Sequence, residues 1–156
     1  MAPVLDLVQQ RLASPGYDTA LEHDMFVVRL PAARLLDTVV LLKDEFQFDL
    51  FLDVTAIDCQ PRTPRFDVVH HFYSTRHFVR IRLKSTVTEA DPTVDSLVSL
   101  YGCAGIMERE CHDMYGIAFR GNADLRPILL YEGFVGHPLR KDYPKLKEQP
   151  LVPYRK

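Results

Sequence analysis

The strongest constraint on the fold of this chain is a pair of strand-like segments joined by a short turn. Arg65–Ser74 (RFDVVHHFYS) and His77–Ser85 (HFVRIRLKS) are rich in β-branched and aromatic residues, and only Thr75-Arg76 separates them. Such segments, so close together, predict an antiparallel hairpin. In the second segment apolar residues alternate with basic ones, so one face should pack on a core while the other meets water or an acidic neighbour. The apolar set is Val79, Ile81 and Leu83, and the basic set is Arg80, Arg82 and Lys84.

Helix and strand signals frame this hairpin. Apolar residues recur at helical spacing in Pro3–Ala13 and after Pro31, and Gly105–Tyr115 predicts a further short helix, whereas Met25–Leu30 and Leu50–Ile57 have the composition of strands. The strands follow one another after the second helix, which favours an α+β fold over a doubly wound sheet. We therefore predict a two-layer α+β sandwich, in which helices pack on one face of a mixed or antiparallel sheet and an extended C-terminal arm follows. The predicted buried faces are Val4, Leu5, Val8 and Leu12, then Leu35, Val39, Leu42 and Phe46.

The composition of the chain changes near residue 120. Five of the eleven prolines lie in the last 37 of its 156 residues, and from Arg140 onward six basic residues accompany two acidic ones. We expect residues 1–119 to form one compact body and residues 120–156 to form an extended arm. Such an arm buries little of itself and is expected to lie on a partner. Its expected contacts are the apolar residues Leu139, Tyr143, Leu146, Leu151, Val152 and Tyr154 and the basic residues Arg140, Lys141, Arg155 and Lys156.

Charge, hydropathy and cysteine content argue against several classes of protein. The 19 basic and 21 acidic residues nearly balance, whereas a nucleic-acid binder would carry a basic excess. No apolar run approaches the roughly 20 residues of a membrane span, and the first residues do not resemble a secretory signal, so the chain is not expected to enter a membrane by itself. The three cysteines, Cys59, Cys103 and Cys111, form no CxxC pair and are expected to be reduced thiols.

The predicted helix Gly105–Tyr115 carries a charge on its apolar side. A helical wheel that starts at Ile106 places Glu110 among the apolar residues. Because an unpaired buried charge is very costly, Glu110 is expected to pair with Arg126 or Arg140, and so to anchor the arm, unless it is solvated at the edge of the helix. The polar side offers two pairs at i, i+4 spacing, Arg109 with Asp113 and Glu108 with His112.

The histidines invite a metal-site hypothesis. His70 and His71 are adjacent, so in a strand they face opposite sides and cannot chelate one ion together. His70 and His77 flank the hairpin turn and Cys59 is a further candidate, but a site needs three or four converging ligands. We therefore predict no metal site.

A free-standing enzyme is the second chemical alternative, with Cys111 or His112 at its centre. Adjacent helical residues do not face each other, and a thiol on an apolar face is ordinarily inert. His137 precedes a proline that holds it extended, which favours a structural hydrogen bond over a proton-relay role. We therefore predict no catalytic residue in this chain.

Three motifs in the last third of the chain carry a family resemblance. They are ERECHDMYGIAF (Glu108–Phe119), DLRPILL (Asp124–Leu130) and GHPLRKDYP (Gly136–Pro144). In order and spacing they resemble the thirty-kilodalton subunit family of respiratory complex I, known in bacteria as the C subunit of NADH-quinone oxidoreductase. The chain departs from the family pattern at Asn122-Ala123, where His-Pro is usual, and at Pro127, where a second Arg is common.

The resemblance implies a non-catalytic structural or assembly subunit of the peripheral arm of a proton-translocating NADH:quinone oxidoreductase. It implies docking beside the forty-nine-kilodalton-type subunit (the D subunit) and neighbouring iron–sulfur subunits, near the quinone-reducing end, on the cytoplasmic side of the cell inner membrane. This chain itself would bind no cofactor; FMN, iron–sulfur clusters, NADH and quinone would belong to the whole complex. The alternative is the equivalent subunit of a related membrane-bound hydrogenase or formate hydrogenlyase-type complex. The residues expected to carry the interface are Glu108, Arg109, Glu110, Asp113, Asp124, Arg126, His137, Arg140, Lys141, Asp142 and Tyr143.

Overall fold

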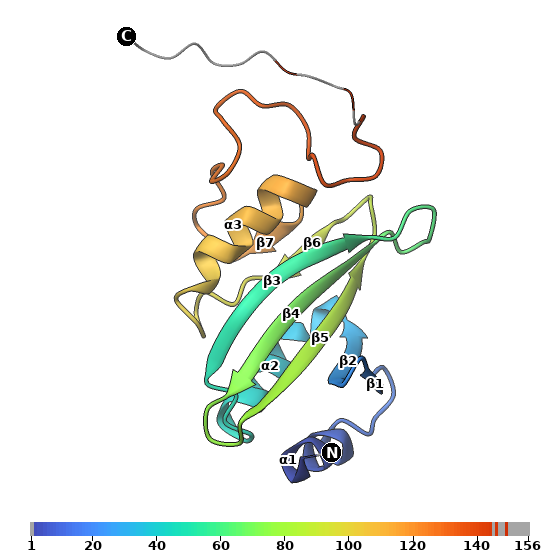
Figure 1. Ribbon diagram of the computed structural model, residues 1–156, viewed down its shortest axis with the longest axis vertical. Coiled ribbons are helices and arrows are strands. Elements are labelled where there is room, and N and C mark those ends of the chain that lie inside the picture. Colours follow the sequence, from blue (N-terminus) through green and yellow to red (C-terminus); the bar gives the residue numbers. More distant parts are fainter. Residues whose placement is uncertain (1, 145, 147–148, 150–156) are drawn as a thin grey trace.

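A five-stranded sheet forms the centre of the protein (Figure 1), as seen in a computed structural model that describes residues 2–144, 146 and 149. Its strand order is β1-β2-β5-β4-β3. β2 and β5 run parallel, and the other neighbours are antiparallel. The strands are β1 (Asp18–Glu22), β2 (Met25–Pro31), β3 (Leu50–Asp58), β4 (Phe66–Ser74) and β5 (Val79–Val87), and a separate parallel pair consists of β6 (Thr93–Asp95) and β7 (Ala118–Arg120).

Three α-helices accompany the sheet, α1 (Pro3–Arg11), α2 (Leu35–Asp44) and α3 (Ala104–Tyr115). The apolar residues of all three belong to one core cluster with the sheet. The two helix faces predicted from spacing are confirmed, since all their members are buried except Phe46, which is partly buried against the core. The structure thus confirms the α+β class.

The predicted start of the second helix is wrong by a few residues. The helical spacing after Pro31 predicts a helix that begins at this proline, but Pro31 ends β2 because its backbone is extended, with φ −61° and ψ 143°. A short 3-10 turn, η1 (Ala32–Arg34), intervenes before α2 begins.

The β4–β5 hairpin is confirmed, together with the orientation of its side chains. Ser74 pairs with Val79 across the turn. Ile81 and Leu83 are fully buried, and the three basic residues that alternate with them point to the opposite, outer face. His70 and His71 lie on opposite faces as predicted: His70 is fully buried in the core and His71 is only half-buried.

Three short strands were not predicted from the sequence. β1 has five residues without regular alternation of burial, and β6 and β7 have three residues each, too few for a period-two pattern to emerge. β6 and β7 nevertheless position the site, because they hold both ends of the segment that contains α3.

α3 packs along β3, at one edge of the sheet, and the chain after β7 passes over the other side of α3 (Figure 1). Among the described residues, none after Arg120 belongs to a helix or a strand. No helix in the described part of the chain is long and apolar enough to cross a membrane.

Candidate functional site: the junction of arm and body

The C-terminal end of α3 is capped by the arm. The last carbonyls of a helix lack partners within the helix, and here each of the last four accepts a hydrogen bond. Gly116 N–H donates to His112 O (2.7 Å). The other three donors belong to the GHPLRKDYP motif: His137 Nδ1 to Asp113 O (2.9 Å), Leu139 N to Met114 O (3.1 Å) and Arg140 Nε to Tyr115 O (2.6 Å).

Gly116 makes this cap possible. Its φ of +72° is the left-handed conformation that favours glycine after a helix. A Cβ atom at this position would lie 2.5 Å from both His137 Nε2 and Arg140 Nη2. The glycine of the DMYGI segment therefore provides both the turn and the space into which the arm fits.

A single carboxylate oxygen of Asp113 binds the first part of the arm. Asp113 Oδ2 accepts hydrogen bonds from the backbone N–H groups of Ile128, Leu129 and Leu130 at 2.8, 2.9 and 3.1 Å. Burial alone would raise the pKa of this carboxyl, but the three N–H donors together hold it below its usual value. The donors begin immediately after Pro127, so the N–H that this proline lacks is not needed here.

Glu108 is a second buried carboxylate of α3 and is completely enclosed. It accepts hydrogen bonds from Ser96 Oγ (2.7 Å), from Leu97 N–H (2.7 Å) and from Asn122 Nδ2 (2.9 Å). Burial raises its pKa, and the three hydrogen bonds oppose that rise. Asn122, which stands where the resembling family usually has His, thus joins the start of the arm to the helix.

The prediction that Glu110 lies on the buried face is wrong. The buried stripe of α3 runs through Ala104, Glu108 and Cys111, whereas Ile106 is 63% exposed and Glu110 is exposed. The predicted apolar sector began at Ile106, whereas the protein buries the Glu108 carboxylate, which has three hydrogen-bond donors, instead. Within the part of the chain that the structure describes, Glu110 has no ion pair with either Arg126 or Arg140.

Arg109 also has partners other than those predicted. Its guanidinium donates to the carbonyls of Arg126 and Pro127, both at 2.9 Å, instead of pairing with Asp113. Asp124 lies 3.8 Å from the same guanidinium and forms a closer, exposed pair with Arg126 at 2.8 Å. Arg109 therefore does anchor the arm, but through main-chain oxygens.

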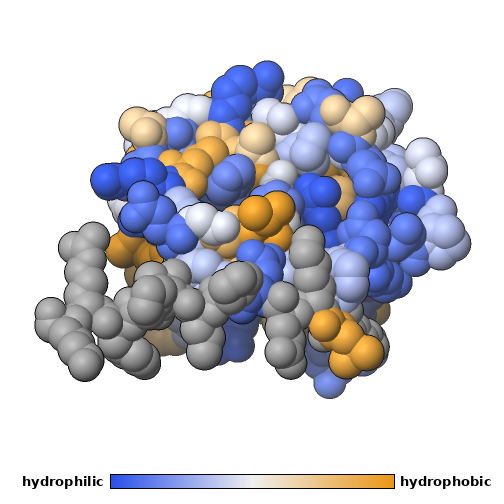
Figure 2. Space-filling view, turned by 90° about the horizontal axis from the view of Figure 1, so that it is seen from above, coloured by the Kyte–Doolittle hydropathy of each residue, from blue (hydrophilic) through white to orange (hydrophobic). Residues whose placement is uncertain are grey.

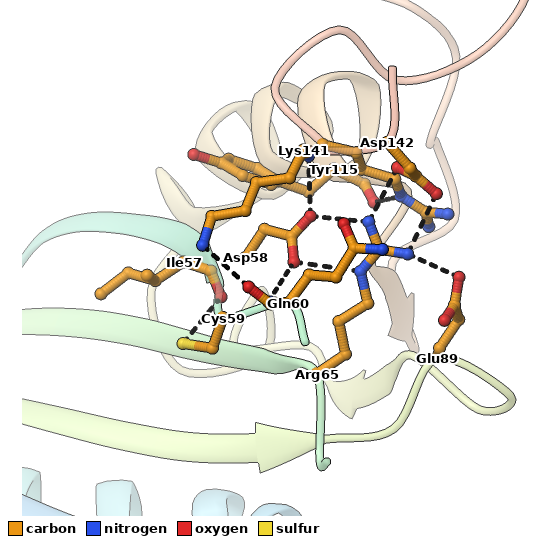
Figure 3. A network of polar contacts seen from close by, with 10 residues as sticks. Ile57, Asp58, Cys59, Gln60, Arg65, Glu89, Tyr115, Lys141 and Asp142 are labelled. Carbon is orange, nitrogen blue, oxygen red and sulfur yellow. Dashed lines mark hydrogen bonds and ion pairs between the residues drawn. The ribbon is translucent and has the colours of Figure 1, made fainter. Parts of the chain in front are cut away.

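A buried arginine, Arg65, joins the body to the far part of the arm (Figure 3). Its side chain is 5% exposed and donates to both oxygens of Asp58 (3.0 and 2.7 Å), which is 2% exposed. The same guanidinium donates to both oxygens of Asp142 (3.0 and 2.7 Å) and to Glu89 (2.6 Å). Hydrogen bonds from Arg65 hold the pKa of Asp58 well below the usual range for carboxyls, and they also lower the pKa of Asp142.

Lys141 and Arg140 complete this junction. Lys141 donates its backbone N–H to Asp58 (2.8 Å) and its Nζ to Gln60 O (3.1 Å). The Arg140 guanidinium lies 5.1 Å from the centre of the Phe66 ring, which is within cation–π range. The sequence analysis placed both side chains against a partner, whereas in the isolated chain they bind the body.

The remaining predicted residues are also accounted for. Tyr143 stacks on Phe134 with ring centres 6.0 Å apart, and its hydroxyl accepts a hydrogen bond from Gln149 (2.8 Å). The structural hydrogen bond predicted for His137 is confirmed. Five of the expected contacts, Leu151, Val152, Tyr154, Arg155 and Lys156, lie outside the described residues.

Sequence reasoning missed Asp58, Arg65 and Asn122. Asp58 and Arg65 flank the loop between β3 and β4, and both are residue types that are usually exposed. Their partner Asp142 lies 77 residues after Arg65 in the sequence. One weak signal existed: Asp58 directly follows the predicted strand Leu50–Ile57, and Arg65 is the first residue of the predicted strand Arg65–Ser74.

The two side chains considered for catalysis, Cys111 and His112, have structural surroundings. Burial raises the pKa of the Cys111 thiol far above its usual value, which makes it a poor nucleophile. His112 donates its Nδ1 proton to Ile117 O (2.8 Å). In the described residues no group of three or more His, Cys, Asp or Glu side chains is arranged to hold a metal ion.

Comparisons with known proteins support one family. A model of the family described as "Respiratory-chain NADH dehydrogenase, 30 Kd subunit" matches residues 28–149. The C subunit of NADH-quinone oxidoreductase from Citrifermentans bemidjiense is 37% identical over 148 residues, covering 95% of this chain and 91% of that protein. The C subunit from Geobacter sulfurreducens is 40% identical over 149 residues, with the same coverage of both chains.

A mitochondrial relative and two solved structures extend this result. NADH dehydrogenase (ubiquinone) iron-sulfur protein 3 of Candida albicans is 44% identical over 78% of this chain and 44% of that protein. A chain of the membrane-bound sulfane sulfur reductase, an archaeal respiratory membrane complex, shares the fold with a TM-score of 0.78 at 22% identity, over 92% of this chain and 85% of that one. The trypsin-resistant fragment (1-134) of Nqo5 superposes with a TM-score of 0.72 at 28% identity, over 78% of this chain and 99% of that chain. Because the family match covers the second half of β2, all of β3 to β5, α3 and the arm contacts described above, this chain belongs to the family of the thirty-kilodalton subunit of respiratory-chain NADH dehydrogenase.

Proposed function

We propose that this chain is a non-catalytic structural subunit of the peripheral arm of a proton-translocating NADH:quinone oxidoreductase. It docks beside the forty-nine-kilodalton-type subunit and its iron–sulfur neighbours, near the quinone-reducing end and on the cytoplasmic side of the inner membrane. FMN, iron–sulfur clusters, NADH and quinone are bound by other subunits. The observation that carries this proposal is the family match over residues 28–149. The motif residues support it, because their hydrogen bonds hold the arm against the body.

The motif residues support an assembly role because they hold the arm in a defined path. The GHPLRKDYP motif caps α3 and reaches Asp58 and Arg65. With its polar groups engaged by the body, the arm presents apolar side chains outward, the arrangement expected of a surface awaiting a partner. These exposed residues are Leu129, Val135, Leu139 and Leu146.

The view onto the arm side of the molecule shows hydrophobic groups set among polar ones (Figure 2). This mixture is typical of interfaces that combine apolar anchors with a polar rim. Leu146, which is 95% exposed, is the most exposed apolar side chain among the described residues, and we assign it to the partner contact.

The first test is a pull-down of the tagged chain from mildly solubilised membranes of its own cell, with identification of co-purifying proteins and an assay of NADH:quinone reductase activity. Recovery in an NADH-oxidising assembly with a forty-nine-kilodalton-type subunit is expected. Recovery with a nickel-binding hydrogenase subunit would select the hydrogenase or formate hydrogenlyase-type alternative. A monomer without partners would overturn the proposal.

A pair of variants tests the arm surface. Leu146→Asp places a charge where a partner should cover an apolar side chain, so the yield of the assembly should fall. Leu7→Asp introduces the same charge at an exposed position of α1, away from the arm, and should leave the yield unchanged. Equal yields from both variants would remove Leu146 from the interface.

A further inference from the structure

Residues of α1, β1, β2 and the β4–β5 turn line a pocket of about 600 Å³. These elements lie at the end of the molecule opposite the arm (Figure 1). Its lining is mostly apolar, and part of it precedes residue 28, where the family match begins. The lining residues that matter here are Leu21, Met25, Tyr73, Phe78 and Arg80.

Two large apolar side chains of this pocket are exposed to solvent. Phe78 is 78% exposed and Leu21 is 64% exposed. Phe78 also has a φ of +55°, a conformation that is unfavourable for a bulky residue and that is concentrated at functional positions. An exposed aromatic in a strained turn beside an apolar pocket indicates a surface that another molecule covers.

Two arginines extend this surface along the outer face of the sheet. The neighbouring cations Arg29 and Lys84 both have an acidic partner in Glu22. In contrast, no described carboxylate pairs with Arg80, and Arg82 Nε donates a hydrogen bond to the unprotonated Nε2 of His71 (2.7 Å).

The spacing of the two arginines is compatible with an extended peptide as the ligand. Arg80 and Arg82 are alternate residues of β5, so they point to the same face about 6.6 Å apart along the strand. This is also the repeat of alternate side chains in an extended peptide, whereas a small ligand would occupy the pocket alone.

We propose that the pocket and the two arginines form a second docking surface, which binds an extended acidic segment of another subunit. One large apolar side chain of that segment enters the pocket, and carboxylates on alternate residues pair with Arg80 and Arg82. This inference rests on the proposed function, because it requires that the chain is part of a complex.

The test places a photo-crosslinking phenylalanine analogue at position 78 in the chain assembled in its own cell, and a second one at position 146 in the arm. The expected product at position 78 is a peptide of another subunit with a large apolar residue within a few positions of alternating Asp or Glu. Crosslinks at position 146 but none at position 78 would overturn the second surface and leave the proposed function intact. Absence of crosslinks at both positions would overturn both proposals.

Two other products at position 78 would also overturn the proposal. A crosslink to a second copy of this chain would indicate self-association, and a crosslink to an acyl chain would indicate a lipid surface. A captured peptide without neighbouring carboxylates would contradict the proposed ion pairs with Arg80 and Arg82.

Matched variants test the charge contribution. Arg80→Glu should lower the crosslink yield at position 78 about tenfold, in line with the loss of a close interfacial charge pair. Arg76→Glu makes the same change at an exposed residue of the same turn that does not line the pocket and should have no effect. Equal yields from the two variants would contradict the proposal. Reversal of the partner's carboxylates to lysine should restore binding to Arg80→Glu.

A variant at position 78 separates docking from folding. Phe78→Asn removes the apolar ring, while Asn tolerates a positive φ better than Phe does. The isolated chain should therefore unfold at the same or a higher denaturant concentration, whereas its yield in the assembly should fall. An unchanged yield would exclude Phe78 from the interface.

Discussion

The sheet and the arm are held in place by opposite means. The inner face of the sheet is buried by apolar packing around residues such as Phe72, Ile81 and Leu83, whereas the arm is held by individual hydrogen bonds to Arg65, Asp113 and the end of α3. An apolar core tolerates exchange among residues of similar volume, but each of these hydrogen bonds needs a particular donor or acceptor. This difference explains why the recognisable motifs belong to the arm and to the helix beneath it.

Among the variants that test this difference, removal of the Arg65 side chain should lower the free energy of unfolding most. Arg65→Leu leaves Asp58 buried without its guanidinium and also releases Asp142, so the free energy of unfolding should fall by about 3–5 kcal/mol. Denaturant unfolding measures the loss, and faster proteolysis after residue 130 reports the release of the arm.

A second arginine of the same loop provides the control. Arg62 pairs with Asp67, but its side chain is 45% exposed, so Arg62→Leu should cost less than about 1 kcal/mol. The loss in Arg65→Leu should be smaller in an Asp58→Asn background, since the buried charge is then absent. Equal losses from Arg62→Leu and Arg65→Leu would show that burial does not determine the strength of this junction.

The second prediction concerns His70, a buried titratable ring in the sheet core. In the structure neither ring nitrogen of His70 has a hydrogen-bond partner, and burial lowers its pKa from 6.5 to about 3. Between these values the unfolded chain binds a proton that the folded chain does not, so stability should fall as the pH decreases below 6.5. From pH 7 to pH 5 the loss from His70 should be about 2 kcal/mol.

His70→Phe should remove this contribution. The difference between the wild-type and His70→Phe free energies of unfolding should therefore change between pH 7 and pH 5, while other titrating groups, including buried Glu108, cancel in the comparison. His77→Phe makes the same substitution at an exposed histidine of the same hairpin and serves as the control. Parallel pH curves for wild type and His70→Phe would show that His70 is protonated as readily in the folded state as in the unfolded state.

The parts of the fold that depend on periodic patterns could be predicted from the sequence. The hairpin, the faces of α1 and α2 and the opposite directions of His70 and His71 all follow from spacing alone. The three-residue strands β6 and β7 could not be found, because they form only where the ends of the α3 segment meet in space. The boundary between a body of residues 1–119 and an arm of residues 120–156 stays a prediction.

The site was predictable in its residues but not in its contacts. The resemblance identified the motifs, yet hydropathy favoured burial of Ile106 over Glu108, because no pattern within one helix reveals that Ser96, Leu97 and Asn122 supply donors. Likewise, the partners of Arg140 and Asp142 lie far away in the sequence. The roles of these residues in an interface with a partner stay predictions.

The third prediction tests the close fit at the end of α3. Gly116→Ala should lower the free energy of unfolding by about 1–2 kcal/mol, because alanine at a positive φ is strained, and it should also displace His137 and Arg140. Gly133 has a φ of +91° but no atom near its Cβ position. Gly133→Ala should therefore destabilise by strain alone and leave the cap in place, as judged by proteolysis of the arm. Equal proteolysis of the two variants would mean that the contacts at Gly116 do not hold the arm.

The smallest expected effect isolates the charge of Asp113. Asp113→Asn preserves the shape of the side chain but replaces charge-assisted hydrogen bonds with neutral ones, so it should weaken the attachment of the arm by about 1 kcal/mol. Hydrogen exchange of the amides at Ile128, Leu129 and Leu130 should then accelerate about fivefold, since 1 kcal/mol corresponds to that factor, while amides of β4 should be unaffected. Glu110→Gln removes a charge from the exposed side of the same helix and should change neither rate. Acceleration in both variants would mean that the net charge of α3, and not the three hydrogen bonds to Asp113, holds this part of the arm.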